Sequence, residues 1–390
     1  MFTPNSVLPY LKSIKVNRSN VQGDIPANII REFAGYICYP YSDILNSMII
    51  CGEYPDIWKI EVQTPIPKVY PPVKCSQLRN ISGLLNFDKV TEKIIGEMMT
   101  SDMKCHMDPS QYGNQKHTSI QHYLVKMLHQ ILIALDGTHD SKFAVIATMI
   151  DWKEAFPRQC PNLGVKAFIN LGVRALLIPV LINFFKNRKM RVKWHGAFSE
   201  VKTLNGSGPQ GSTIGLLEYL AQSNSNADCV DENMKFKFLD DLSILEVVNL
   251  LSIGISSYNI KQHVPSDVQV NNGYIPAGEL KSQDYVNQIC EWTSNNKMKL
   301  NVEKSNVMVF NPTKSKFITR ISMNEKILPI IGKTKLLGTV ITEDLKWDEN
   351  TSEIIKKANQ RLLLLRKVKE YTNNVDDLKT IYIYHMLEVS

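Results

Sequence analysis

The feature that most constrains the fold is a pair of adjacent carboxylates between two short β-prone runs. Asp240 and Asp241 separate the run 236–239 from the run 242–245. The aromatic and branched residues of both runs fit a half-buried pleated surface, and Asp tolerates the positive backbone angles of a tight turn. The spacing predicts a β-hairpin with both carboxylates at its tip. An isolated Asp pair is common in structural turns, so a metal site needs further support.

Two further stretches supply that support. Residues 143–150 form a continuous apolar run, typical of a buried strand, that ends at Asp151. Residues 206–212 form a glycine-rich loop ahead of a helical pattern. If both strands lay in one antiparallel sheet, Asp151 and Asp240 would come together at one edge. They would then offer Mg²⁺ the carboxylate oxygens that it prefers.

Three strings in chain order, IDWKEAF, GPQGS and FLDD, closely resemble the central motifs of reverse transcriptases. The flanking sequence resembles the non-LTR (LINE-type) retrotransposon branch, over nearly the whole chain from about Asp24. The resemblance implies an α/β (α+β) fold, a right-hand polymerase with fingers, an antiparallel-sheet palm and a partial helical thumb. The implied parts are an N-terminal helical extension at 1–60, fingers at 61–140, a palm with a fingers insertion and primer-grip element at 141–345, and the start of a truncated thumb at 346–390.

The reaction that the resemblance implies is RNA-directed DNA synthesis by a two-metal mechanism, using Mg²⁺ or Mn²⁺. Its partners would be an RNA template, a DNA primer and deoxynucleoside triphosphates. The implied metal ligands are Asp151, Asp240, Asp241 and the backbone carbonyl of Trp152, with Asp241 either coordinating or supporting the turn. Lys304 matches a lysine that would donate a proton to the pyrophosphate leaving group.

Five residues match positions that contact the nucleotide in the family: Lys68, Arg79, Phe156, Gln210 and Gly211. The guanidinium of Arg79 presents a planar fork that suits phosphate oxygens. Phe156 matches the aromatic gate that rejects a 2′-hydroxyl, although a lone Phe after a strand is commonly a core residue. The glycines of the loop would let the backbone approach a nucleotide, with the next helix starting beside its phosphates.

The basic residues cluster, although the net charge of the 390-residue chain is only +7. One cluster contains Arg188, Lys189 and Arg191, and another contains Lys357 and Arg361. Apolar and cationic residues alternate between 189 and 194, which predicts a strand with one cationic face. Both clusters fit a polyanionic partner, here the template–primer duplex, although a solvated face is the alternative interpretation.

Several classes of protein are not indicated. The seven cysteines include no Cys-x-x-Cys pair and no Cys/His cluster, so we expect neither a disulfide framework nor a zinc site. A reducing intracellular setting is expected instead. The longest apolar run, 175–182, is too short for a membrane helix. The sequence stops inside a helical pattern, which favours a truncated copy. Protein partners and compartment stay open.

Two alternative functions also stay open. An RNA-dependent RNA polymerase shares the palm and its acidic pair, and the residue at position 156 would separate the two through sugar selection. A decayed or domesticated copy would bind nucleic acid without polymerising. Pro157 supports that alternative, because it stands where related retrotransposon sequences usually have Asp.

Overall fold

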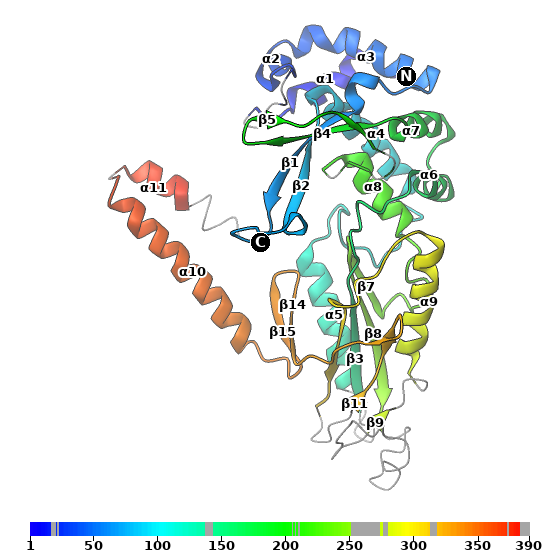
Figure 1. Ribbon diagram of the computed structural model, residues 1–390, viewed down its shortest axis with the longest axis vertical. Coiled ribbons are helices and arrows are strands. Elements are labelled where there is room, and N and C mark those ends of the chain that lie inside the picture. The colour runs from blue at the N-terminus through cyan, green and yellow to red at the C-terminus, as the bar shows by residue number, and fades with distance from the viewer. Residues whose placement is uncertain are drawn as a thin grey trace.

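Two groups of elements lie one above the other, and a long helix projects from them to one side (Figure 1). The computed structural model describes residues 1–16, 21, 23–136, 143–204, 206, 208–209, 211–250, 274–275, 280–312, 318–372 and 374–382. The upper group holds the N-terminal helices and a mixed sheet, and the lower group holds an antiparallel sheet with helices packed on it.

Helices and strands mix along the chain. The helices are α1 (Pro4–Lys12), α2 (Ala27–Glu32), α3 (Ala34–Cys51), α4 (Asn86–Met103), α5 (Ile120–Leu135), α6 (Pro161–Asn170), α7 (Ile178–Phe185), α8 (Thr213–Gln222), α9 (Lys281–Asn295), α10 (Asp348–Lys369) and α11 (Val375–Tyr382). The longer strands are β1 (Ile60–Pro67), β2 (Leu78–Gly83), β3 (Phe143–Ile150), β4 (Lys189–Trp194), β7 (Lys235–Phe238), β8 (Asp241–Asn249), β10 (Asn306–Phe310), β14 (Lys333–Leu336) and β15 (Thr339–Thr342). Two-residue strands are β5 (Ala197–Phe198), β6 (Lys202–Thr203), β9 (Tyr274–Ile275), β11 (Ile318–Thr319), β12 (Ser322–Met323) and β13 (Lys326–Ile327). This mixture confirms the predicted α/β (α+β) class.

The antiparallel sheet has the strand order β10-β3-β8-β7. Val145 and Ala147 of β3 belong to the apolar cluster that α5 covers, whereas Ala144 and Ile146 belong to the cluster that α9 covers. Because both faces of this strand are covered, its sequence is apolar throughout and does not alternate. The predicted buried strand ahead of Asp151 is therefore confirmed.

The mixed sheet has the order β2-β1-β4-β5, with β6 also beside β4. β1 runs antiparallel to β2 and parallel to β4. The alternating stretch from Lys189 to Trp194 forms β4, so the predicted strand is confirmed with its predicted ends.

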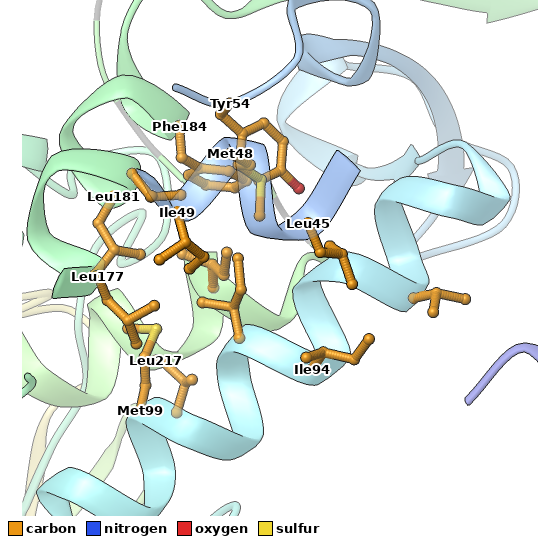
Figure 2. Packing of buried hydrophobic residues seen from close by; sticks show 14 of the residues in the cluster. Leu45, Met48, Ile49, Tyr54, Ile94, Met99, Leu177, Leu181, Phe184 and Leu217 are labelled. Carbon is orange, nitrogen blue, oxygen red and sulfur yellow. The ribbon is translucent and has the colours of Figure 1, made fainter. Parts of the chain in front are cut away.

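Apolar side chains from helices far apart in the sequence pack together in the upper group (Figure 2). The labelled members come from α3 and the turn after it, α4, α7 with the residues just before it, and α8: Leu45, Met48, Ile49, Tyr54, Ile94, Met99, Leu177, Leu181, Phe184 and Leu217. Full burial of one such side chain contributes about 1.5–3 kcal/mol. This cluster fixes α8, the helix that follows the glycine-rich loop, against α4.

Helix α10 lies at the side of the molecule and has no buried residue (Figure 1). The side chains of Ile354, Ile355 and Leu363 on it are each more than half exposed. An ion pair between Lys333 of β14 and Glu349 links the start of this helix to the β14–β15 hairpin. In the described part of the chain, every helix is too short or too polar to cross a membrane.

Candidate active site

The two adjacent carboxylates lie at a tight turn between β7 and β8. Phe238 pairs with Asp241, so Leu239 and Asp240 form a two-residue connection, and the predicted hairpin is confirmed. The positive backbone angle falls on Leu239, with φ of 55°, and not on either Asp. Two-residue hairpins need positive φ, which a bulky residue adopts only at a cost in energy.

Asp151 directly follows β3 at the same edge of the sheet. Ile150 pairs with Leu242, so one more step of this register brings Asp151 level with Asp241. The side chain of Asn301 donates a hydrogen bond from Nδ2 to Asp151 Oδ2 at 2.7 Å. Asp151 is therefore held in one orientation by a residue that arrives from far along the chain.

The three carboxylates interact electrostatically. Burial raises the pKa of Asp151, Asn301 and Lys304 oppose that rise, and Asp240 adds to it. Burial also raises the pKa of Asp241 to about 6, with further contributions from Asp240 and Asp151. The positive charge of Lys304 thus favours the ionised form of Asp151.

The acidic groups at this site are Asp151, Asp240 and Asp241. Among the described residues, no group of three or more His, Cys, Asp and Glu side chains is placed to hold a metal ion on its own. Mg²⁺, however, commonly takes only one or two carboxylates and completes its octahedron with water and substrate phosphates. The charge of Asp240 raises the pKa of Asp151 and of Asp241, and a bound cation would offset that repulsion, so the three carboxylates fit such a site.

Phe156 follows Asp151 by five residues and is half-buried. Its ring stacks on Tyr219 of α8, with centroids 5.2 Å apart and an interplanar angle of 29°. Tyr219 is fully buried, and its pKa is raised by burial and then by the charges of the acidic residues Asp240, Asp241 and Asp151. Phe156 is therefore both a packing residue and a neighbour of the acidic site.

Trp152 has a structural role that the sequence did not indicate. Its side chain is buried and meets Trp292 edge to face, with centroids 5.8 Å apart. It forms a bridge with Leu300, whose flanking hydrogen bonds use the carbonyls of Asp151 and Lys299. The carbonyl of Trp152 is not the one used in that bridge.

The glycine-rich loop packs against the protein itself. A Cβ atom on Gly208 would lie 2.7 Å from Glu218 Oε2 and 2.8 Å from the Cα atom of Gly215. The amide of Gly208 also donates to Gln159 Oε1 at 3.3 Å. Gly208 is thus needed for close packing on α8, and a role beside a nucleotide stays a prediction.

Gly211 differs from Gly208. It is exposed, its φ is 108°, and among the described residues a Cβ atom there would meet only Ser82 O, at 3.5 Å. This backbone conformation favours glycine, and the position is open to a ligand. Gln210 lies outside the described residues.

The N-terminus of α8 contacts a carboxylate of the protein. Ser212 Oγ accepts from the amide of Gly215 at 3.0 Å and donates to Glu92 of α4. Glu92 also accepts from the amide of Ile214 at 3.2 Å, and burial raises its pKa. Part of the first turn of this helix therefore binds an internal acid, and the expectation that the helix starts beside bound phosphates stays a prediction.

Arg188 is not on the surface, which corrects its assignment to the duplex-binding cluster. Its side chain is 1% exposed, and its guanidinium lies over the ring of Phe184, 4.4 Å from the centroid. Burial raises the pKa of Asp88, Glu92 and Glu61, and the charge of Arg188 opposes that rise. Arg188 therefore compensates buried acids and cannot reach a duplex.

The other predicted basic residues are at least partly accessible. Lys189 is exposed on β4, and the half-buried Arg191 lies over the ring of Phe198, 4.3 Å from its centroid. On α10, Lys357 and Arg361 are half-buried, and no residue of that helix is fully buried.

Lys68 and Arg79 are exposed near the end of the β1–β2 hairpin where the connecting loop joins the two strands. Arg79 pairs with Ile66 in that hairpin, one step from its end, and Lys68 directly follows β1. Both belong to the upper group of elements, whereas Asp151, Asp240 and Lys304 belong to the lower sheet.

Two functional candidates were missed from the sequence. Asn301 orients Asp151, and its place three residues before Lys304 is the signal that could have identified it. Tyr219 stacks on Phe156, and its only sequence signal is its place in the helical pattern that follows the glycine-rich loop.

Comparisons with known proteins agree with the motifs. No family model matches the chain. The curated protein "Probable RNA-directed DNA polymerase from transposon X-element" of Drosophila melanogaster is 23% identical over 319 residues, which are 80% of this chain and 32% of that protein. The chain thus spans about a third of that relative's length. The resemblance to retrotransposon reverse transcriptases is confirmed.

A solved structure also matches, that of apo telomerase from Candida tropicalis truncated from its C-terminal domain. The match covers 84% of this chain and 62% of that one, with 12% identity and a TM-score of 0.44.

Proposed function

We propose that this chain is an RNA-directed DNA polymerase that adds deoxynucleotides to a primer 3′-hydroxyl. The observation that carries the proposal is the meeting of Asp151, Asp240, Asp241 and Lys304 at one edge of the antiparallel sheet. These residues come from three stretches far apart in the chain. The curated relative, by its name, is an RNA-directed DNA polymerase.

Asp151 and Asp240 would hold a divalent cation, Mg²⁺ or Mn²⁺, and Asp241 would coordinate or support the turn. The carbonyl of Trp152 is a further candidate ligand. When bound, two such ions stabilise the charge on the attacking and leaving oxygens of an in-line displacement. Asn301 contributes by fixing the carboxylate of Asp151 in one orientation.

In the reaction, a bond forms between the primer 3′-oxygen and the α-phosphorus, and the bond from that phosphorus to the bridging oxygen of pyrophosphate breaks. The 3′-hydroxyl loses its proton, and the departing pyrophosphate gains one. Lys304, an exposed lysine whose charge acts on Asp151, is the proposed proton donor.

Phe156 would select the sugar of the incoming nucleotide. Its ring offers no hydrogen-bond acceptor, so a 2′-hydroxyl pressed against it would lose water without replacement. Stacking on the buried Tyr219 supports this role, because it holds the ring in place beside the carboxylates. Selection against ribonucleotides would distinguish a DNA polymerase from an RNA polymerase with the same acidic pair.

The remaining contacts would come from basic residues outside the acidic site. Lys68, Arg79 and the open Gly211 would meet the nucleotide from the segment that we interpret as fingers, 61–140, and from the loop. Lys189, Arg191, Lys357 and Arg361 would contact phosphates of the template–primer duplex. In this interpretation residues 1–60 form the N-terminal extension, 141–345 the palm, and 346–390 the start of the thumb.

The test is primer extension by the whole chain on poly(rA)/oligo(dT), with Mg²⁺ or Mn²⁺ and with either dTTP or UTP. We expect extension with dTTP that stops in the variant Asp151→Asn. The exposed Glu200, changed to Gln, is a matched control that should keep the activity. Preference for UTP would support an RNA polymerase, and duplex binding without extension would support a copy that binds nucleic acid only.

A further inference from the structure

A short segment ahead of α5 pairs with the outer strand of the antiparallel sheet that carries the carboxylates. Residue Gln111 forms a parallel bridge with Lys237 of the edge strand β7. The amide of Lys237 donates to the carbonyl of Ser110 at 2.9 Å, and the amide of Tyr112 donates to the carbonyl of Lys237 at 2.8 Å. The segment is thus paired with the strand that leads directly into the carboxylate turn.

The side chain of Gln111 reaches the turn itself. Its Oε1 atom accepts hydrogen bonds from the amides of Leu239 at 3.0 Å and Gly113 at 2.8 Å. Leu239 is the residue with the positive φ of 55°, a conformation that bulky side chains rarely adopt. Gln111 is buried, so these bonds are shielded from competition with water.

Gly113 leaves room for this arrangement. A Cβ atom at position 113 would lie 2.5 Å from the amide nitrogen of Leu239 and 3.0 Å from Gln111 Oε1. The contact with the backbone nitrogen of Leu239 is too close for a Cβ atom, so glycine at this position lets the segment approach the turn.

The segment is anchored on its other side by a buried ion-pair group. Asp108 Oδ2 lies 2.6 Å from Lys237 Nζ and 3.2 Å from Lys235 Nζ, and its Oδ1 accepts from the amide of Ser110 at 2.9 Å. Asp108 therefore joins the start of the segment to alternate side chains of β7, and the position of Gln111 relative to the turn is fixed at both ends.

From these contacts we propose that Gln111 is a positioning residue that holds the Leu239 turn in its left-handed conformation, so that Asp240 and Asp241 face Asp151. The proposal rests on the proposed polymerase function for its kinetic effect. It does not rest on that function for the geometry, because the hydrogen bonds join Gln111 to the backbone of the turn.

The experiment compares Gln111→Met, which removes the acceptor, with Gln111→Glu, which retains it. Three properties of the whole chain are measured: amide hydrogen exchange at residue 239, Mn²⁺ binding as monitored by electron paramagnetic resonance, and kcat and KM for primer extension. Gln121→Met on the exposed face of α5 is the matched control.

In Gln111→Met we expect faster exchange at residue 239, weaker Mn²⁺ binding and kcat lower by about tenfold with KM for the duplex unchanged, as follows from losing a buried acceptor. Gln111→Glu, which keeps an acceptor at this position, should give wild-type values in all three measurements. In a Leu239→Gly background the loss should shrink to about threefold or less, because glycine adopts positive φ without help.

Unchanged exchange at residue 239 in Gln111→Met would overturn the proposal, as would an equal loss in the Leu239→Gly background. If the wild type fails to extend primers, the proposed function fails while exchange at residue 239 still decides the role of Gln111. If Gln111→Met does not fold, Gly113→Ala tests the same contact, and unaltered exchange there would also overturn it.

Discussion

Glu218 of α8 should make the protein less stable as the pH rises, and its replacement by Gln should remove that effect. The side chain is fully buried, and neither of its oxygens has a hydrogen-bond partner within the described ranges. Burial raises its pKa from 4.5 to about 8. The folded state therefore keeps a proton that the unfolded state releases above pH 4.5.

The sign and size follow from this difference in proton binding. Between pH 4.5 and 8 the folded chain binds more protons at Glu218 than the unfolded chain, so stability falls with rising pH and levels off above the folded pKa. At about 1.4 kcal/mol per pH unit, the loss reaches roughly 3 kcal/mol by pH 7. Glu218→Gln is uncharged throughout and should be more stable than the wild type by about that amount at pH 7.

The assay is urea unfolding of the wild type and of Glu218→Gln at several values between pH 5 and 8. The stability difference between the two should grow with pH, and it cancels the contribution of other buried acids such as Asp88 and Glu92 because both proteins contain them. Glu200→Gln, at an exposed position, should show no such growth. A difference that stays constant across this range would refute the reasoning.

Three further predictions concern the proposed function. Asp151→Asn and Asp240→Asn should each abolish primer extension and leave duplex affinity within about twofold, since they remove charge from the acidic site and not from the basic surface. Gel-based assays measure extension, and fluorescence anisotropy measures duplex affinity. Near wild-type extension would contradict the assignment of the metal ligands. Phe156→Val should raise incorporation of ribonucleotides relative to deoxynucleotides by at least about tenfold in competition assays, and an unchanged ratio in an active variant would contradict the gate. Charge reversal at Lys357 and Arg361 should flatten the salt dependence of duplex binding, whose log-log slope is about −0.9 per phosphate contact, and an unaltered slope would mean a solvated face.

The central strands could be predicted because their signals are local. An apolar run covered on both faces, as in residues 143–150, and a period-two alternation, as in 189–194, each indicate a strand directly. The hairpin at Asp240 was also predictable from its flanking residues. Its strained residue was not, because propensity assigns the positive angle to Asp and the structure assigns it to Leu239.

The basic cluster shows where sequence reasoning fails. Arg188 differs from Lys189 by one position, and charge alone cannot tell which of the two is buried. The alternation of a strand offered a signal that Arg188 is buried, because Arg188 falls on the same side of the pattern as the apolar residues Met190 and Val192. Its partners could not be predicted, since Asp88 and Glu92 lie on a distant helix that packs there only in the folded chain.

Leu239 and Glu218 are both in energetically unfavourable states. The groups that surround each residue indicate whether it has a functional role or only lowers stability. Leu239 has an unfavourable backbone angle, yet Gln111 Oε1 accepts a hydrogen bond from its amide, and the absence of a side chain at Gly113 leaves room for it. Strain that is supported from outside the turn persists at functional sites, which favours a role for this turn in presenting Asp240. Glu218 is buried without a partner among the described residues, and it lies against Gly208 of the loop instead of in the acidic site. A buried carboxyl group that keeps its proton in the folded state affects the stability of the protein, and the pH series measures that effect directly.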